Sequence, residues 1–250
     1  MAHLSNKVAV VTGASKGIGA GVAKRLAAEG ATVVVNYSSS RDGAEAVVSE
    51  IEQSGGHAVA IGGSVADEAQ VAHLFEAVRS AFGRVDVLVN NAGIYAPAPL
   101  DALSVAEFHR HFDINVLGLL LATKAALPLF PETGGSIVNI SSIVSTFAPP
   151  DAAVYVSTKG AVDAITKSLA KELAPRKVRV NAIRPGLVLT EGVHTAGMSG
   201  GEFEAQMLAH TPLGRVGQPD DIAASVAFLA SDDASWITGD TLNVAGGAGM

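Results

Sequence analysis

Tyr155 and Lys159 have the clearest chemical potential in this sequence, because a predicted helix over 152–173 would carry both on one face, one turn apart. A tyrosine hydroxyl has a pKa of about 10, so it is a weak acid or base at neutral pH. A nearby ammonium favours the phenolate and lowers that pKa. The pair could therefore exchange a proton with a substrate oxygen, although helices also contain this spacing by chance.

Further polar residues come directly after predicted strands. Ser141 and Ser142 follow a strand over 136–140, and residues 90–93 (Asn-Asn-Ala-Gly) end a strand over 85–90. Each group alone would be ordinary turn chemistry. The carboxyl ends of parallel strands, however, meet at one edge of a sheet, where open α/β sheets bind their ligands. We therefore expect these side chains to face the same crevice as the tyrosine and the lysine.

Gly13, Gly17 and Gly19 form a G-x-x-x-G-x-G pattern between the first predicted strand and the first predicted helix. Glycines there let backbone amides close around a pyrophosphate at the positive end of the helix. One alternative is a tight turn without a ligand. Another is the nucleophile elbow of a serine hydrolase, because residues 13–17 also match G-x-S-x-G. The elbow is disfavoured, since it normally follows several strands and no downstream Asp/His pair stands out.

Residues 36–41, Asn-Tyr-Ser-Ser-Ser-Arg, follow the second predicted strand and bear on the choice of nucleotide. A site for NAD usually has an acidic residue here, which binds the ribose 2′-hydroxyl. This sequence has none before Asp42 and offers hydroxyls and a cation instead, with Lys16 nearby in the glycine-rich turn. That chemistry suits a 2′-phosphate and favours NADP(H), although a serine-rich helix start would give the same pattern.

The elements that must position these residues alternate along the chain. Strands are expected over residues 8–12, 32–36, 58–61, 85–90, 136–140, 178–183 and 241–244. Helices are expected over residues 18–29, 42–53, 68–81, 104–129, 152–173 and 220–230. Repeated strand–helix–strand units predict a doubly wound α/β fold, Rossmann-like, with a mostly parallel seven-stranded sheet and helices on both faces. Because no linker or repeat interrupts the pattern, we expect residues 1–250 to form one domain.

The glycine-rich segment 191–214 breaks this alternation. Long irregular segments in compact domains are usually lids or disordered loops, and this one follows a strand at the ligand-binding edge. We therefore expect a mobile lid over the substrate. The expected pocket lining is mostly apolar and comprises Tyr95, Val144, Phe147, Leu187, Val193, His194, Met198, Phe203 and Met207.

Composition excludes several classes of function. The 250 residues contain no cysteine, which excludes disulfides, thiolate metal sites and cysteine nucleophiles. A net charge of −7 without a basic cluster argues against nucleic acid as a partner. His109 and His111 share no helix face, so no metal is expected. Gly, Pro, Lys or Asp interrupts each apolar run before the ~20 residues of a membrane span. With no leader pattern, we expect a cytoplasmic protein without membrane contact.

Together, and in this order, the motifs resemble those of the short-chain dehydrogenase/reductase family over essentially the whole chain. The resemblance rests on residues 12–19, residues 90–93, Asn115, Ser142, Tyr155 with Lys159, and Pro185-Gly186. It implies that Tyr155 protonates a carbonyl oxygen in reduction or acts as the base in oxidation. Lys159 would lower the tyrosine pKa and hold the nicotinamide ribose. Ser142, thirteen residues before the tyrosine, would bind the substrate oxygen, and Asn115 would hold a water in a proton relay.

The resemblance also implies an NADP(H) site and a homotetramer with contacts through the helices over 104–129 and 152–173 and the C-terminus. The implied cofactor-binding residues are Gly13, Ser15, Lys16, Gly17, Ile18, Gly19, Asn36, Tyr37, Ser38, Ser39, Ser64, Val65, Asn91, Ala92, Gly93, Tyr155, Lys159, Pro185, Gly186, Val188 and Thr190. Ser64 departs from the family, which usually has Asp or Asn there to hold the adenine amino group. Serine also accepts a hydrogen bond, but its side chain is shorter.

We therefore expect an NADP(H)-dependent oxidoreductase that transfers a hydride between the cofactor and a carbonyl/secondary alcohol pair, foremost a hydrophobic ketone or a 3-oxoacyl compound. Family members that reduce carrier-bound substrates tend to have basic residues before the fifth strand, to dock an acidic carrier. Residues 130–135 contain no cation, which by this resemblance disfavours a carrier-bound substrate. The alternatives are a sugar or polyol dehydrogenase of the same fold and a non-catalytic dinucleotide-binding sensor. The apolar pocket argues against the sugar, and the intact Ser142, Tyr155 and Lys159 argue against the sensor.

Overall fold

The structure is a computed structural model that describes residues 3–195, 197 and 199–249, the side chain of Phe203 excepted. Its centre is one seven-stranded sheet in the order β3-β2-β1-β4-β5-β6-β7, in which every neighbouring pair is parallel. The strands are β1 (Val8–Val11), β2 (Thr32–Tyr37), β3 (His57–Gly62), β4 (Val87–Asn90), β5 (Gly135–Ile140), β6 (Val178–Pro185) and β7 (Thr241–Val244). The predicted doubly wound fold is confirmed.

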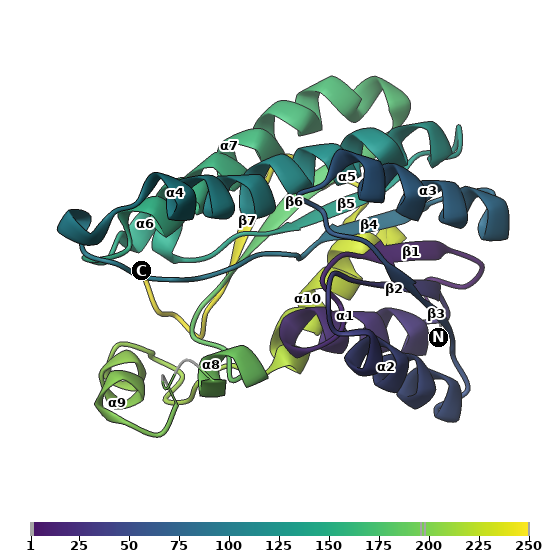
Figure 1. Cartoon of the computed structure of the whole chain (residues 1–250). Helices are drawn as coiled ribbons and strands as arrows, with labels where there is room; N and C mark the ends of the chain where they lie inside the picture. The colour runs from purple at the N-terminus through teal and green to yellow at the C-terminus, as the bar shows by residue number, and fades with distance from the viewer. Residues whose placement is uncertain (1–2, 196, 198, 250) are drawn as a thin grey trace.

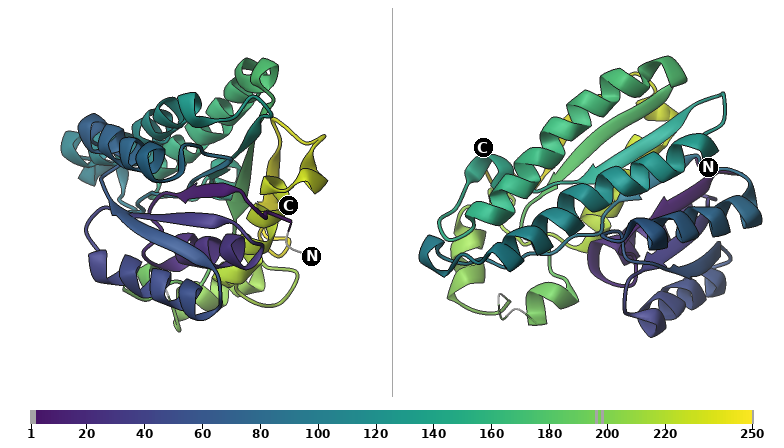
Figure 2. Two further views of the ribbon diagram at one scale, coloured as in Figure 1. Left: turned by 90° about the vertical axis from the view of Figure 1, so that its right-hand side faces the viewer. Right: turned by 45° about the horizontal axis from the view of Figure 1, so that its top comes forward.

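A layer of helices covers each face of the sheet, so that the molecule has three layers (Figures 1 and 2). One helix layer contains α1 (Gly17–Ala28), α2 (Arg41–Gln53) and α10 (Pro219–Ala230). The other contains α3 (Glu68–Phe82), α4 (Val105–Phe112), α5 (Gly118–Ala126) and α7 (Ala153–Leu173). Short 3-10 turns lie at Leu100–Ala102, Leu127–Leu129, Ala174–Arg176 and Asp232–Ala234.

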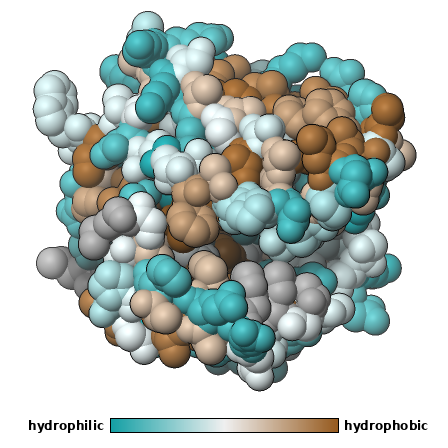
Figure 3. Space-filling view, turned by 90° about the vertical axis from the view of Figure 1, so that its left-hand side faces the viewer, coloured by the Kyte–Doolittle hydropathy of each residue, from teal (hydrophilic) through white to brown (hydrophobic). Residues whose placement is uncertain are grey.

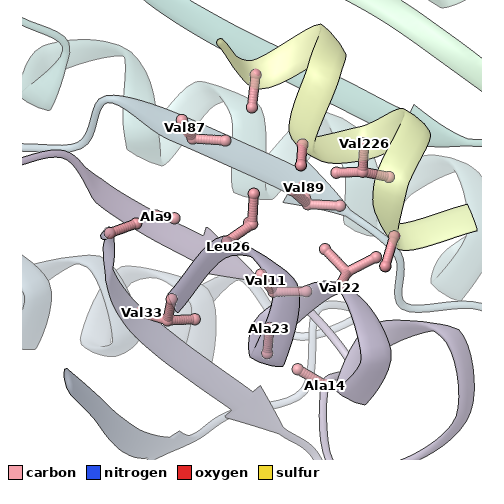
Figure 4. Packing of buried hydrophobic residues seen from close by; sticks show 14 of the residues in the cluster. Ala9, Val11, Ala14, Val22, Ala23, Leu26, Val33, Val87, Val89 and Val226 are labelled. Atoms are coloured by element: carbon pink, nitrogen blue, oxygen red, sulfur yellow. The ribbon is translucent and has the colours of Figure 1, made fainter. Parts of the chain in front are cut away.

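Two hydrophobic cores, one under each helix layer, explain the apolar character of the strands. Successive residues of a strand point to opposite faces, so Val11 belongs to the core under α1 and α10, and Val10 to the core on the other face. Figure 4 shows Val11 near Leu26 of α1, and Val89 of β4 near Val226 of α10. Because both faces are covered, the central strands are buried at every position and need apolar residues throughout.

The single helix predicted over 104–129 is interrupted in the structure. A π-helical turn, η2 (Asp113–Leu117), lies between α4 and α5 and contains the buried Asn115. Single π-helical turns inside helices occur frequently at functional sites, because they re-aim the side chains of one turn. The interruption therefore falls at the residue for which the family resemblance implies a function.

The whole run Val105–Leu129 is long and apolar enough, by length and composition, to cross a membrane. The expectation concerned uninterrupted apolar runs, and Arg110, Asp113 and Lys124 interrupt this one. In the fold this run forms part of the helix layer over the sheet, and 39% of its most apolar window is buried. Ala122 and Ala126 belong to the core on that face. The apolar character of the run is therefore explained in part by its packing against the sheet.

Segment 191–214 contains helices where we expected irregular structure. α8 (Glu191–Thr195) and α9 (Glu202–Ala209) lie away from the sheet, at the lower left of Figure 1. Glycines precede α9, and two glutamates in its first turn favour the helix N-terminus. Helices this short carry too little periodicity to be recognised from the sequence, and the same holds for α6 (Val144–Phe147). The motion of this segment stays a prediction.

Candidate active site

The structure brings the four predicted catalytic residues together at the carboxyl edge of the sheet. Tyr155 and Lys159 lie one turn apart on α7, Ser142 follows β5, and Asn115 lies on η2. A small crevice there is lined in part by Asn115 and Lys159, with Thr12 from the end of β1 and Asn90 from β4. Residues that are far apart in the sequence thus meet where an α/β sheet binds its ligand.

The Tyr155 side chain is held in a half-buried position beside a second tyrosine. Its ring packs edge-on against Tyr95, with ring centroids 4.8 Å apart and an interplanar angle of 75°. Burial raises the pKa of the Tyr155 hydroxyl to about 12, a hydrogen bond with Ser142 lowers it, and the neighbouring Tyr95 raises it. The hydroxyl is therefore protonated across the neutral range, so it can donate a proton.

Lys159 does not lower the pKa of the tyrosine in this structure, contrary to the expectation from the sequence. Its Nζ lies 5.7 Å from the centroid of the Tyr155 ring and donates a hydrogen bond to the carbonyl oxygen of Ile140 at 2.8 Å. Burial lowers the pKa of Lys159 to about 8, and Asp163 raises it. Because both groups are desolvated, each pKa moves toward its neutral form.

Asn115 clamps the loop after β4 against α7. Its Nδ2 donates to the carbonyl oxygen of Ile94 at 3.0 Å and to Oγ1 of Thr158 at 3.1 Å, and its Oδ1 accepts from the Ile94 amide at 2.8 Å. Thr158 in turn donates to the carbonyl oxygen of Tyr155 at 2.7 Å. The Asn115 side chain thus supports the helix that carries the tyrosine, while its part in a proton relay stays a prediction.

The two serines after β5 differ in what they contact. Ser141 is buried and donates to the carbonyl oxygen of Lys159 at 3.3 Å, which ties β5 to α7. Ser142 is less buried, accepts from the Val144 amide at 3.3 Å, and is the serine whose hydroxyl acts on Tyr155. Ser142 is therefore the serine that contacts Tyr155, and its binding of a substrate oxygen stays a prediction.

The glycine-rich turn is packed tightly against the loop after β4. Gly13 has φ +62°, and a Cβ there would lie 2.9 Å from Cα of Ala92. A Cβ on Gly19 would lie 2.5 Å from the Gly13 carbonyl oxygen. Asn91 closes the contact, because its Nδ2 donates to the carbonyl oxygens of Thr12 and Gly13, each at 2.9 Å. These two glycines are therefore required by close packing as well as by any ligand.

The N-terminus of α1 presents a backbone amide to an anion. The Gly17 amide, at φ +59°, donates to Oε2 of Glu191 at 2.9 Å, and α1 has no acidic residue in its own first turn. A carboxylate from α8 thus occupies the place where a pyrophosphate would gain from the same amide and the same helix end. The turn therefore fits an anionic group. Sequence reasoning missed Glu191, because it lies 174 positions from Gly17.

Lys16 and the residues after β2 surround the place predicted for a 2′-phosphate. Lys16 is exposed and forms no ion pair among the described residues. Arg41, by contrast, is paired with Glu45 at 2.6 Å. Ser38 and Ser39 are exposed and remain accessible to a ligand.

Asn36 has a structural place that the sequence did not show. Its Oδ1 accepts from the Gly13 amide at 3.3 Å, and its Nδ2 donates to the carbonyl oxygens of Ile61 and Gly63. The side chain is buried and holds the glycine-rich turn against the end of β3. Tyr37 packs its ring on Gly62 of the neighbouring strand. Both residues thus support the predicted nucleotide site through contacts with the protein itself.

The remaining predicted cofactor residues lie around the same edge. Ser64 accepts from the Ala66 amide at 3.3 Å, Val65 is buried, and Gly93 is next to both Asn115 and Lys159. Pro185 ends β6 and Gly186 packs on Ala245. Val188 pairs with Gly217, Thr190 packs on Gly17, and Ser15 and Ile18 belong to the glycine-rich turn and the start of α1.

The pocket expected from the sequence is described only in part. Met198 and the side chain of Phe203 lie outside the described residues. Of the others, Tyr95 and Phe147 are exposed beside the site, at 40% and 55%. Figure 3 shows apolar side chains on the side of the molecule that carries the outer ends of α4, α6 and α9. Within the described part of the chain, no group of three or more His, Asp or Glu side chains could hold a metal ion.

Comparison with known proteins agrees with this geometry. A family model described as enoyl-(acyl carrier protein) reductase matches residues 13–249. An uncharacterized oxidoreductase of Methylorubrum extorquens is 58% identical over 99% of both chains. A 3-oxoacyl-[acyl-carrier-protein] reductase of Staphylococcus aureus is 45% identical over 98% of both. The solved structure of an angucycline C-6 ketoreductase with bound NADP is 34% identical, with a TM-score of 0.93 over 99% of this chain and 97% of that one. The chain belongs to the short-chain dehydrogenase/reductase family.

Proposed function

We propose that this protein is an NADP(H)-dependent reductase that converts a hydrophobic ketone or 3-oxoacyl compound into a secondary alcohol. The observation that carries the proposal is the protonated Tyr155 hydroxyl beside Ser142, with the buried Lys159 one turn along α7. A carbonyl oxygen that receives this proton needs a donor that is still protonated at neutral pH. Two of the relatives named above, a 3-oxoacyl-[acyl-carrier-protein] reductase and a ketoreductase, reduce carbonyl compounds.

Each residue of the site has one task in this reaction. The bound nicotinamide supplies the hydride that the carbonyl carbon receives. Ser142 donates a hydrogen bond to the substrate oxygen, and Tyr155 Oη transfers its proton to that oxygen as the carbonyl is reduced. Asn115, through Thr158, keeps α7 in place. Lys159, whose Nζ lies 5.7 Å from the centroid of the Tyr155 ring and donates to the Ile140 carbonyl oxygen, supports the tyrosine with its charge.

The function is tested with a panel of ketones and alcohols, assayed with NADPH and NADH. Aryl and medium-chain alkyl ketones should be reduced with NADPH, and glucose should be a poor substrate, because apolar walls leave its hydroxyls without partners. Efficient oxidation of glucose would favour the sugar dehydrogenase. Tight binding of NADPH without turnover on any substrate would favour the sensor.

Lys16 should discriminate between the two cofactors. Lys16→Ala should raise KM for NADPH about fivefold, the effect of ~1 kcal/mol for an exposed ion pair, and leave KM for NADH unchanged, because only NADPH carries the 2′-phosphate. Lys24→Ala is the matched control, since it removes an exposed lysine of α1 that pairs with Glu50 at 2.7 Å. Equal losses for both cofactors would show that Lys16 does not contact the phosphate.

Glu191 should oppose cofactor binding. Its carboxylate accepts from the Gly17 amide, so an incoming pyrophosphate must displace it. Glu191→Gln should therefore tighten NADPH and NADH alike by about two- to fivefold, since a charge at a helix N-terminus contributes ~0.3–1 kcal/mol. Fluorescence titration of each cofactor measures the change. Glu202→Gln, at the start of α9, is the control. Weaker binding in Glu191→Gln would contradict the displacement.

We further propose a cytoplasmic homotetramer. Several apolar side chains of the run from α4 to α5 are exposed, among them Phe108 at 39%, Leu117 at 42% and Leu120 at 37%. An apolar face of this kind is typical of a surface that meets another copy of the chain. Light scattering of the purified protein measures the number of copies.

A further inference from the structure

Asp163 and Arg184 form a largely buried ion pair that the mechanism above does not use. Asp163 lies on α7 and Arg184 on β6, and their side chains are only 10% and 16% exposed. Nε and Nη2 of Arg184 donate to the same oxygen of Asp163, Oδ2, at 3.0 and 2.8 Å. The other oxygen, Oδ1, is buried and has no hydrogen-bond partner. Oδ1 of this buried carboxylate therefore acts on its surroundings through its charge and not through a hydrogen bond.

Lys159 lies one helical turn before Asp163 on α7. Residues four apart lie on one helix face, and both side chains are buried between α7 and the sheet. The strands bring the arginine to the same place, because Ile140, whose carbonyl oxygen accepts from Lys159, is paired with Ile183, the neighbour of Arg184. Three charges from α7 and β6 therefore surround the end of β5.

We propose that Asp163 and Arg184 are positioning residues that set the charge of Lys159 for the reaction, with Asp163 favouring its ammonium and Arg184 limiting that effect. The inference rests on the proposed function, in which Lys159 supports the proton-donating tyrosine. A bare buried carboxylate at this position would hold the lysine protonated at every physiological pH. Arg184 binds one oxygen of that carboxylate and offsets its field, so that Lys159 can lose or gain a proton near neutral pH.

The electrostatic surroundings of Lys159 agree with this assignment. Burial lowers the pKa of Lys159 to about 8, and Asp163 is the charged group that raises it. The elements around this face carry four other titratable side chains that are buried or half-buried. They are Tyr155 on α7, Arg179 on β6, Asp113 on η2 and His111 on α4, and β5 and α6 carry none. None of these four changes the pKa of Lys159 as Asp163 does.

The test is the pH profile of kcat/KM for NADPH-dependent ketone reduction in the wild type and in Asp163→Asn and Arg184→Gln. Asparagine removes the negative charge, so the Lys159 ammonium is less favoured and the alkaline limb should move about 0.5–1 pH unit to lower pH. Glutamine still offers a donor to Asp163 but leaves its charge uncompensated, so the limb should move to higher pH by a similar amount. In the double variant it should return toward the wild-type position.

Opposite shifts from the two single variants support the proposal, because a general loss of packing would affect both profiles in the same way. Shifts in one direction, or lower activity with an unmoved limb, would overturn it. Titration of the protein with [13Cε]lysine by NMR, in which the Lys159 signal is the one missing from Lys159→Met, measures the same shifts without turnover. If the wild type reduces no ketone, the proposed function fails, and the NMR titration alone decides this inference.

Discussion

Tyr155→Phe should lower kcat for ketone reduction by about 10²–10⁴-fold, the range that a positioned general acid contributes. Phenylalanine keeps the ring that packs on Tyr95, so the fold of the site is retained and only the proton donor is lost. NADPH affinity should change little, because the hydroxyl acts on the substrate oxygen. Steady-state kinetics and a fluorescence titration of NADPH on the same preparation separate the two effects.

Tyr95→Phe is the matched control for this loss. The centroids of the two tyrosine rings lie 4.8 Å apart, and Tyr95 is 40% exposed at the same site. The Tyr95 hydroxyl, however, has no part in the proposed proton transfer. Its removal should change kcat by a few-fold at most. Near-wild-type turnover in Tyr155→Phe, or an equal loss in Tyr95→Phe, would contradict the assignment of Tyr155 as the acid.

The sheet was predictable because its pattern depends on local rules. Strands such as β1 and β4 are apolar at each buried position since both their faces are covered. The helices between them are long enough to show a periodic pattern. Repeated strand–helix–strand units then predict that neighbouring strands run parallel, with right-handed crossovers. Because parallel strands end at the same edge of a sheet, the sequence also predicts that residues at the ends of β4 and β5 lie at one edge.

The π-helical turn at Asn115 could not be predicted, because it depends on contacts between distant segments. The asparagine side chain bonds Ile94 and Thr158, 21 and 43 positions away. Helical periodicity runs through this stretch without a break, so the sequence pattern predicts one continuous helix. The contact between Glu191 and Gly17 could not be predicted for the same reason, because no sequence pattern around either residue indicates it.

The pKa values of Tyr155 and Lys159 show a second limit of prediction from the sequence. Spacing placed Tyr155 and Lys159 on one helix face, and proximity alone predicts a lower pKa for the tyrosine. The structure shows the opposite direction, because burial raises the pKa of Tyr155 to about 12 and lowers that of Lys159 to about 8. Burial depends on the packing of α7 against β5 and β6, which spacing within one helix does not contain.

Lys159→Met should lose about 10²–10³-fold in turnover, as expected when a preorganised charge is removed from an active site, and yet gain stability at pH 7. The pKa of Lys159 falls from 10.5 to about 8 on folding, which corresponds to a cost of about 3 kcal/mol at ~1.4 kcal/mol per pKa unit. Methionine avoids that cost but leaves the Ile140 carbonyl oxygen without its donor, a loss of about 1–2 kcal/mol. The net gain should be about 1–2 kcal/mol.

The pH dependence of this gain identifies its cause. Below pH 8 both folded and unfolded wild type carry the ammonium, so the folded state bears the whole cost of burying it. Between pH 8 and 10.5 the folded protein releases the proton first, and wild-type stability rises relative to the variant. The advantage of Lys159→Met should therefore be constant below pH 8, shrink above it and disappear by about pH 9.5.

Thermal unfolding at pH 7 and pH 9.5, at one protein concentration, measures both parts of this prediction. At pH 7 the Tm of Lys159→Met should exceed that of the wild type by about 2–8 °C, since 1 kcal/mol shifts the Tm of a chain of this size by ~2–4 °C. Lys167→Met, an exposed lysine on the same helix, is the control and should show no pH-dependent difference. A lower Tm for Lys159→Met at pH 7 would mean that the ammonium is stabilised by its surroundings, and that its pKa is not depressed by burial.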